Sequence, residues 1–160
     1  MIKFFELTIE DLPFLNEVRN ECCEQYLHNS NIFTIEETRE WFNKTRPLFW
    51  IIKSDDERIG YFRSSNYSSE NRNIYIGADL HKDFRGKGVG FQVYKEFLPF
   101  LFKKYVLHKV SLEVLITNER AINLYNKLGF TIEGVKRDEV LKNGEWVDSI
   151  IMSILENEFE

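Results

Sequence analysis

Hydrophobic and polar residues follow one another along the chain in segments that predict both strands and helices. Short apolar runs typical of strands occur at residues 2–7, 48–53, 58–63, 74–80 and 109–116, and aliphatic residues alternate with period two in residues 74–80. Two closing strands are expected at residues 130–137 and 145–155. In residues 89–105, by contrast, Val89, Val93, Phe97 and Leu101 recur every fourth residue, which predicts a helix with one buried face.

Further helices are predicted from their end signals. Thr8 with Asp11, and Thr34 with Glu37, fit the capping box that opens a helix. The first pair predicts a helix to about residue 23, and the second predicts one that ends before Pro47. These two helices are separated by a polar loop at residues 26–31.

The last helix and two tight turns are predicted from turn residues. Asn118 is expected to cap a helix that ends at Gly129 in the left-handed conformation. Residues 54–57 read as a hairpin turn, and Asn143-Gly144 reads as another. No linker or repeat interrupts the order, so we expect one α/β domain over residues 1–160.

Composition and charge restrict the classes of function. The 160 residues carry a net charge of −5 and are 43% hydrophobic, as expected of one soluble globular domain that does not bind nucleic acid in bulk. The longest apolar run, residues 97–102, is far shorter than the roughly 20 residues that cross a bilayer. The acidic N-terminal segment does not resemble a secretory signal, so we expect a cytoplasmic protein without a membrane partner. Cys22 and Cys23 are adjacent, and we expect both to be reduced packing residues.

A glycine-rich turn between a strand and a helix is the most informative local feature. Three of the eight glycines lie in Arg85-Gly86-Lys87-Gly88-Val89-Gly90, just before the predicted long helix. Amide groups at the start of a helix bind phosphate, and basic side chains favour it. The spacing fits neither the dinucleotide fingerprint G-x-G-x-x-G nor the P-loop. The alternative is a tight surface loop with no ligand.

Two motifs resemble the GNAT (Gcn5-related N-acetyltransferase) superfamily. Arg85-x-x-Gly88-x-Gly90 is similar to its pyrophosphate loop, and residues 113–130, which end in Tyr125-x-x-x-Gly129-Phe130, resemble its next motif. Lys82 stands where many members have proline. The resemblance implies a mixed, mostly antiparallel twisted sheet of about seven strands flanked by about four helices, with acetyl-CoA as co-substrate.

The resemblance also implies roles for two residues in acetyl transfer. An amine is mostly protonated at neutral pH and must lose a proton before it attacks a thioester, and Glu113 matches the position of a base in one branch. Tyr125 matches the general acid that protonates the departing thiolate. The structural alternatives are a solvent-facing strand carboxylate for Glu113 and core packing for Tyr125. Other members take the base from elsewhere or use a chain of waters.

Further positions are assigned to the coenzyme through the resemblance alone. The backbone of Leu80 would pair with the pantetheine arm and help to polarise the thioester carbonyl. Asn118 would both cap its helix and donate a hydrogen bond to the coenzyme. The phosphates would be bound by the turn residues Arg85, Gly86, Lys87, Gly88, Val89 and Gly90.

The acceptor is the least determined part of the prediction. The three histidines are dispersed and no Cys/His spacing resembles a metal site, so no metal is expected. In this architecture the acceptor pocket is formed by the loop between the first two helices and by the closing strands, which gives Tyr26, His28, Asn29, Trp50, Arg137, Asp138, Glu139, Trp146 and Asp148.

The predicted acceptor is a small-molecule amine. Arg19-Asn20 and residues 34–42 resemble the amino-sugar branch, so the leading candidate is a nucleotide-linked amino sugar. A protein N-terminus and a polyamine stay open as alternatives, as does a non-catalytic module that binds acetyl-CoA. A homodimer also stays open.

Overall fold

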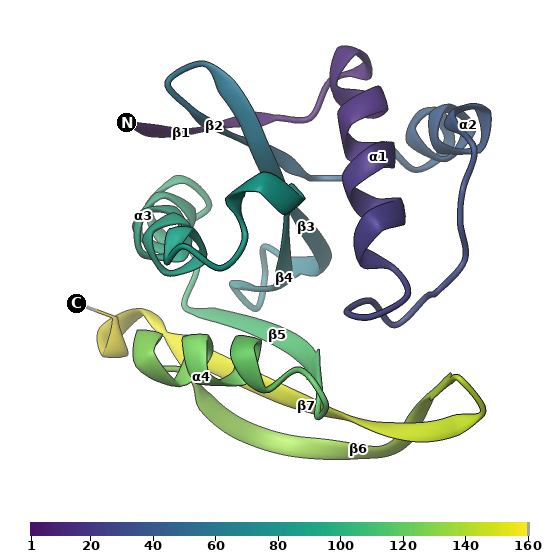
Figure 1. Ribbon diagram of the computed structural model, residues 1–160. Helices are drawn as coiled ribbons and strands as arrows, with labels where there is room; N and C mark the ends of the chain where they lie inside the picture. Colours follow the sequence, from purple (N-terminus) through teal and green to yellow (C-terminus); the bar gives the residue numbers. More distant parts are fainter. Residues whose placement is uncertain (160) are drawn as a thin grey trace.

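A single seven-stranded sheet organises the chain in the computed structural model, which describes residues 1–159 (Figure 1). Its strand order is β1-β2-β3-β4-β5-β7-β6, and every neighbouring pair is antiparallel except β4 and β5. The strands are β1 (Ile2–Glu6), β2 (Trp50–Ser54), β3 (Glu57–Ser68), β4 (Asn73–Leu80), β5 (Lys109–Leu115), β6 (Thr131–Lys142) and β7 (Glu145–Leu155). The helices are α1 (Leu12–Cys22), α2 (Ile35–Thr45), α3 (Val89–Lys104) and α4 (Glu119–Leu128), with short 3₁₀ turns at Ile9–Asp11, Lys82–Phe84 and Glu156–Glu158. The predicted fold class is confirmed.

Helices cover both faces of the sheet and bury a separate apolar cluster on each. On one face, α3 and α4 pack against the centre of the sheet in the larger cluster, and Phe97 of α3 stacks on Phe62 of β3. On the other face, α1 and α2 enclose a smaller cluster that reaches Ile51 and Tyr61. Figure 1 shows α3 on one side of the sheet and α1 with α2 on the other. No helix among residues 1–159 is long and apolar enough to cross a membrane.

The alternation of side chains along β2 corrects one sequence prediction. Successive residues of a strand face opposite sides of the sheet, so Trp50 and Ile51 enter different clusters. Trp50 is fully buried against Phe97 and Tyr105 beneath α3. The expectation that Trp50 lines the acceptor pocket is therefore wrong, because its side chain lies on the opposite face from α1 and α2.

The two parallel strands at the centre of the sheet separate partway along their length. β4 pairs with β5 only from Asn73 to Tyr75 on β4 and from Lys109 to Ser111 on β5. Beyond these residues β4 continues to Leu80 and β5 to Leu115 without pairing to each other. The sheet is therefore open between these two strands, and backbone groups of β4 on that side have no partner on β5 there.

The predicted helix ends and turns are present. Thr34 Oγ1 accepts a hydrogen bond from the Glu37 amide at 3.1 Å, and Asn118 Oδ1 accepts one from the Ala121 amide at 3.3 Å. Gly129 ends α4 with a φ of 97°. Asn143 and Gly144 have positive φ, as the hairpin between β6 and β7 requires. Both cysteines are free and buried, which confirms their assignment as packing residues.

Two strands extend further than their sequence predicts. β3 runs on past Arg63 to Ser68, because Ser64 and Ser65 pair with β4 although they are polar. β6 runs on past residue 137 to Lys142, with register shifts along its pairing to β7. Hydrogen bonds to neighbouring strands extend both strands, and the spacing of apolar residues in the sequence does not predict such pairing.

Candidate active site

The glycine-rich turn offers exposed backbone at the start of α3. Gly86 and Gly88 both have a φ of 76°, a conformation that favours glycine, and Gly88 is the residue that caps α3. A Cβ placed on Gly88 would meet no atom within 4 Å, so the space beside this backbone is open. At Gly90 a Cβ would lie 3.5 Å from Leu124 of α4 and 4.0 Å from Leu80 of β4. The turn therefore packs between the end of β4 and the side of α4.

The basic residues of the turn make contacts within the protein. Arg85 donates from Nε to the Leu80 carbonyl at 2.8 Å, and its Nη2 lies 3.5 Å from Glu21 of α1. The Arg85 side chain thus fastens the turn to β4 and α1. Lys87 is exposed, and its Nζ donates to the Asp83 carbonyl at 3.0 Å.

The sequence-predicted coenzyme residues lie along one continuous path. Leu80 ends β4 at the opening, the turn follows it, and Asn118 caps α4 beside the turn. Arg120 in the first turn of α4 is close to Gly86, where a Cβ would come within 2.9 Å of its guanidinium. Open backbone at a helix start, with a guanidinium beside it, fits the pyrophosphate of a coenzyme. The residues present therefore fit acetyl-CoA.

Tyr125 lies in α4, on the face of the sheet that α3 covers. Its side chain is 8% exposed, and its hydroxyl is 3.3 Å from the hydroxyl of Tyr94 in α3. Burial is the largest cause that raises the pKa of Tyr125, whereas the hydrogen bond with Tyr94 acts in the opposite direction. The phenol is therefore protonated at neutral pH and able to donate a proton.

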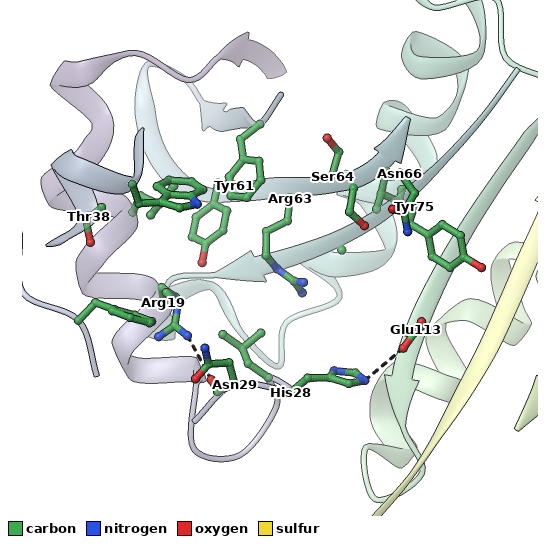
Figure 2. Close-up of a pocket in the computed structure, with 18 of the residues that line it drawn as sticks. Arg19, His28, Asn29, Thr38, Tyr61, Arg63, Ser64, Asn66, Tyr75 and Glu113 are labelled. Atoms are coloured by element: carbon green, nitrogen blue, oxygen red, sulfur yellow. Dashed lines mark hydrogen bonds and ion pairs between the residues drawn. The ribbon is translucent and has the colours of Figure 1, made fainter. Parts of the chain in front are cut away.

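A cavity of about 650 Å³ lies on the other face of the sheet, beneath α1 and α2 (Figure 2). It combines aromatic and aliphatic walls with hydroxyl, amide and charged groups. The lining residues come from α1, α2, the loop between them, the residue before β2, β3, β4 and one position of β5: Leu15, Arg19, Leu27, His28, Asn29, Phe33, Glu37, Thr38, Trp41, Phe49, Tyr61, Arg63, Ser64, Ser65, Asn66, Tyr75, Ile76, Gly77 and Glu113.

Glu113 projects from β5 into this cavity and is held by three partners. Its Oε1 accepts from Lys136 Nζ at 2.6 Å, and its Oε2 is 3.3 Å from Ser149 Oγ and 3.5 Å from His28 Nε2. His28 Nε2 is also 2.9 Å from Ser149 Oγ. Figure 2 marks the contact between His28 and Glu113 with a dashed line. Burial is the largest cause that lowers the pKa of His28, although Glu113 opposes it. His28 is therefore neutral at pH 7.

Arg63 occupies the centre of the cavity floor. Its Nε donates to Asp79 Oδ2 at 2.9 Å and its Nη2 to Asp79 Oδ1 at 3.4 Å, and Asp79 is only 4% exposed. The guanidinium lies directly over Gly77 of β4, where a Cβ would come within 2.5 Å of Nη2. This close approach explains why a glycine stands inside the strand.

Tyr61 stands beside Arg63 on the same face of β3. It is 1% exposed, and its hydroxyl lies near the Asp79 carboxylate but has no partner at full hydrogen-bond distance among residues 1–159. Burial is the largest cause that raises the pKa of Tyr61, and the Asp79 carboxylate raises it further. In Figure 2 the Tyr61 hydroxyl and the Arg63 guanidinium both point toward the cavity.

The sequence identified two of the cavity residues from the acceptor set, His28 and Asn29. The others, Tyr26, Arg137, Asp138, Glu139, Trp146 and Asp148, do not line it. Trp146 is 62% exposed at the far end of the β6–β7 hairpin, and Asp148 Oδ1 accepts from the Asp138 amide within that hairpin. Except for Tyr26, these residues lie on β6 and β7, which extend beyond the cavity.

Sequence reasoning missed the arginine and tyrosine of the cavity floor. Arg63 was the last residue of a predicted strand, and Tyr61 precedes it by two positions on the same face. A glycine on the neighbouring strand was the available signal, because Gly77 lies opposite Arg63 in the register. This signal could be interpreted only once the register showed that Gly77 pairs with Arg63.

One group of possible metal ligands occurs away from the cavity. Glu17, Glu21 and His81 place one ligand atom each within 4.8 Å of one another. Glu21 is 3.5 Å from Arg85 and 4.0 Å from Lys82, so it already has cationic partners. Glu21 is therefore already paired with basic residues of the turn region.

Comparisons with known proteins agree with this geometry. A model of the acetyltransferase (GNAT) family matches residues 14–130. Spermidine N(1)-acetyltransferase of Escherichia coli is 25% identical over 99% of this chain and 88% of its own length. The [ribosomal protein uS5]-alanine N-acetyltransferase of Escherichia coli is 23% identical over 71% of this chain and 60% of its own. A crystal structure of spermidine N-acetyltransferase from Vibrio cholerae with CoA and spermine superposes with a TM-score of 0.90 at 23% identity, covering 98% of this chain and 96% of that one.

Proposed function

The chain belongs to the acetyltransferase (GNAT) family, whose members take the acetyl group from acetyl-CoA, and we propose that it acetylates the primary amine of a small molecule. The leading candidate is a nucleotide-linked amino sugar. One observation carries the proposal: a protonated tyrosine and a cavity with a proton acceptor lie on opposite faces of the sheet, where β4 and β5 separate. An acetyl donor and an amine can meet through this opening.

In this proposal the coenzyme supplies a thioester, and the protein supplies binding and proton transfer. The residues that would hold the coenzyme are the backbone of Leu80, the turn Arg85, Gly86, Lys87, Gly88, Val89 and Gly90, and Asn118. The amides at the start of α3 bind phosphate, and amides of β4 at the opening stabilise negative charge on the reacting carbonyl oxygen. Tyr125 holds the proton that the thiolate needs.

The proton acceptor in this proposal is Glu113 together with His28. A neutral imidazole can take a proton from an ammonium group, and a carboxylate 3.5 Å away stabilises the imidazolium that forms. Lys136 fixes Glu113 from the other side at 2.6 Å. The predicted base thus acts through a neighbour that lines the cavity, and it need not contact the amine itself.

The walls of the cavity support an amine that has both apolar and polar parts. Phe33, Trp41 and Phe49 offer ring faces, whereas Asn29 and Asn66 offer amide groups. Aromatic faces and amides suit a sugar ring or a nucleotide base. The cavity volume of about 650 Å³ is typical of a site for a small molecule.

A polyamine is the second candidate, favoured by a spermidine acetyltransferase that matches 99% of this chain. A polyamine carries several positive charges, which call for several carboxylates in the pocket. Two carboxylates line this cavity, Glu37 and Glu113, and Glu113 already pairs with Lys136. Arg19 and Arg63 line the same cavity. The charge of the cavity thus supports the polyamine less well than the amino sugar.

Thiol release from acetyl-CoA over a panel of amines tests the proposal. The panel contains an amino sugar, its nucleotide-linked form, spermidine and a peptide with a free N-terminus. We expect turnover with amino sugars to exceed turnover with spermidine. Turnover confined to spermidine or to the peptide would replace the leading candidate, and tight coenzyme binding with no turnover on any amine would favour a binding module.

A further inference from the structure

We propose that Arg63, with Tyr61 beside it, binds an acidic group of the acceptor, so that the preferred substrate is an amine that also carries a carboxylate or a phosphate. This inference rests on the proposed function, because it assigns a recognition element to the same acceptor cavity. It concerns the floor of the cavity, which lies on the opposite face of the sheet from Tyr125, although Arg63 and Asp79 are near enough to influence the pKa of Tyr125.

Arg63 is held by the protein along one edge of its guanidinium. Asp79 engages Nε and Nη2 of the guanidinium, whereas Nη1 has no hydrogen-bond partner among the described residues. The Arg63 side chain is 39% exposed, and the Asp79 side chain is 4% exposed. One edge of the planar fork is therefore fixed from beneath, and the other is available to the cavity. A guanidinium with a free edge binds the two oxygens of a carboxylate or phosphate well.

A glycine lies directly below the Arg63 guanidinium. Gly77 leaves room for Arg63 to lie flat against β4, since a Cβ there would come within 2.5 Å of Nη2 and 3.0 Å of Nη1. The fixed orientation reduces the side-chain entropy that binding would cost. Arg63 is thus preorganised, unlike Arg19, whose guanidinium already donates to the Asn29 and Asn31 carbonyls.

The Tyr61 hydroxyl is a second hydrogen-bond donor next to Arg63. It is buried, and among residues 1–159 it has no partner at full hydrogen-bond distance, although the Asp79 carboxylate lies near it. Burial, followed by the charge and hydrogen bonding of Asp79, raises the pKa of Tyr61, so the group is a donor at neutral pH. The free edge of Arg63, with this donor next to it, calls for a ligand group that only accepts hydrogen bonds. An ionised acid is such a group.

Paired amines that differ only in the acid test the inference. The probes are phenylalanine with its amide, glucosamine 6-phosphate with glucosamine, and spermidine. The readouts are kcat/KM for acetylation and, independently of chemistry, calorimetric affinity for the complex with CoA. We expect at least one acid to be preferred over its neutral partner by about tenfold or more, the size expected of one charged hydrogen bond. The two pairs distinguish a carboxylate from a phosphate.

Two variants assign that preference to the cavity floor. Tyr61→Phe removes one hydroxyl and leaves the ring in the smaller apolar cluster, so it keeps the fold, and Arg63→Lys keeps a cation for Asp79 but loses the free edge. We expect each to reduce the ratio of acid to neutral amine by about tenfold. Tyr75→Phe is the matched control, because the Tyr75 hydroxyl points away from Arg63 (Figure 2) and its removal should not change the ratio.

The possible outcomes separate this inference from the proposed function. Equal affinity and equal turnover for acids and neutral partners, or a preference for spermidine, would overturn the acidic subsite while leaving acetyl transfer intact. Binding of an acid that depends on Arg63 and Tyr61, without any acetylation, would keep the subsite and overturn the proposed function. An acid preference unchanged in both variants would also overturn the assignment.

Discussion

Replacing Tyr125 with phenylalanine separates its chemical role from its structural one. The Tyr125 hydroxyl has one hydrogen-bond partner among the described residues, the Tyr94 hydroxyl at 3.3 Å. Tyr94→Phe removes the same hydrogen bond from the other side and leaves the Tyr125 hydroxyl in place. Both variants should therefore lose similar stability, about 1–3 kcal/mol, because each leaves one buried hydroxyl without a partner.

The kinetic consequences of the two variants should differ strongly. A positioned general acid contributes about 10²- to 10⁴-fold to the rate, which corresponds to roughly 3–5 kcal/mol of transition-state stabilisation. We expect Tyr125→Phe to lower kcat by that factor in an assay of thiol release, whereas the Kd for CoA stays near its original value. Tyr94→Phe should lower kcat by less than about tenfold. Thermal unfolding of both variants supplies the control for stability.

Two results would refute this reasoning. If Tyr125→Phe retained kcat within about threefold, the leaving thiolate would not depend on the phenol. If Tyr94→Phe lost as much activity as Tyr125→Phe, the loss would follow from the shared hydrogen bond and packing, and the structural reading of Tyr125 would stand.

The other predictions concern the coenzyme turn and the proton acceptor. Gly88→Val places a branched side chain at a φ of 76° and beside open backbone, so it should raise the Kd for CoA by about tenfold or more in calorimetry; unchanged affinity would show that the turn does not bind the coenzyme. His28 is active when neutral and its pKa lies below its ordinary value of 6.5, so its contribution should be present above that pH and be lost as the pH falls. The ratio of kcat/KM for the wild type to kcat/KM for His28→Gln should therefore be largest above pH 6.5 and approach one at acidic pH. The ionisation of the amine affects both proteins equally, so it cancels in this ratio. A ratio that does not change with pH would contradict the role of His28.

Local signals in the sequence were sufficient for most of the fold. The four-residue repeat from Val89 to Leu101 and the caps at Thr34 and Asn118 act within a few residues, so they could be read directly. The ends of β3 and β6 were missed, because their polar residues are held by neighbouring strands. Pairing between segments far apart in the chain is not encoded in the period of either segment.

The acceptor cavity shows the same limit more clearly. Trp50 was assigned to the cavity and lies in the core, because a shift of one residue along a strand changes the face. Arg63 and Asp79 are sixteen residues apart and meet only when β3 pairs with β4. The motif of the glycine-rich turn could be recognised because its residues are contiguous, whereas the proposed acceptor cavity is assembled from five elements, the loop between α1 and α2, and the residue before β2.

The most direct test of the account is mass spectrometry of the amine after incubation with acetyl-CoA and the protein. The account predicts one acetyl group on the amine for each thiol released, with a substrate that carries an acid preferred over its neutral partner. Coenzyme that binds at the turn while every amine in the panel stays unmodified would contradict it.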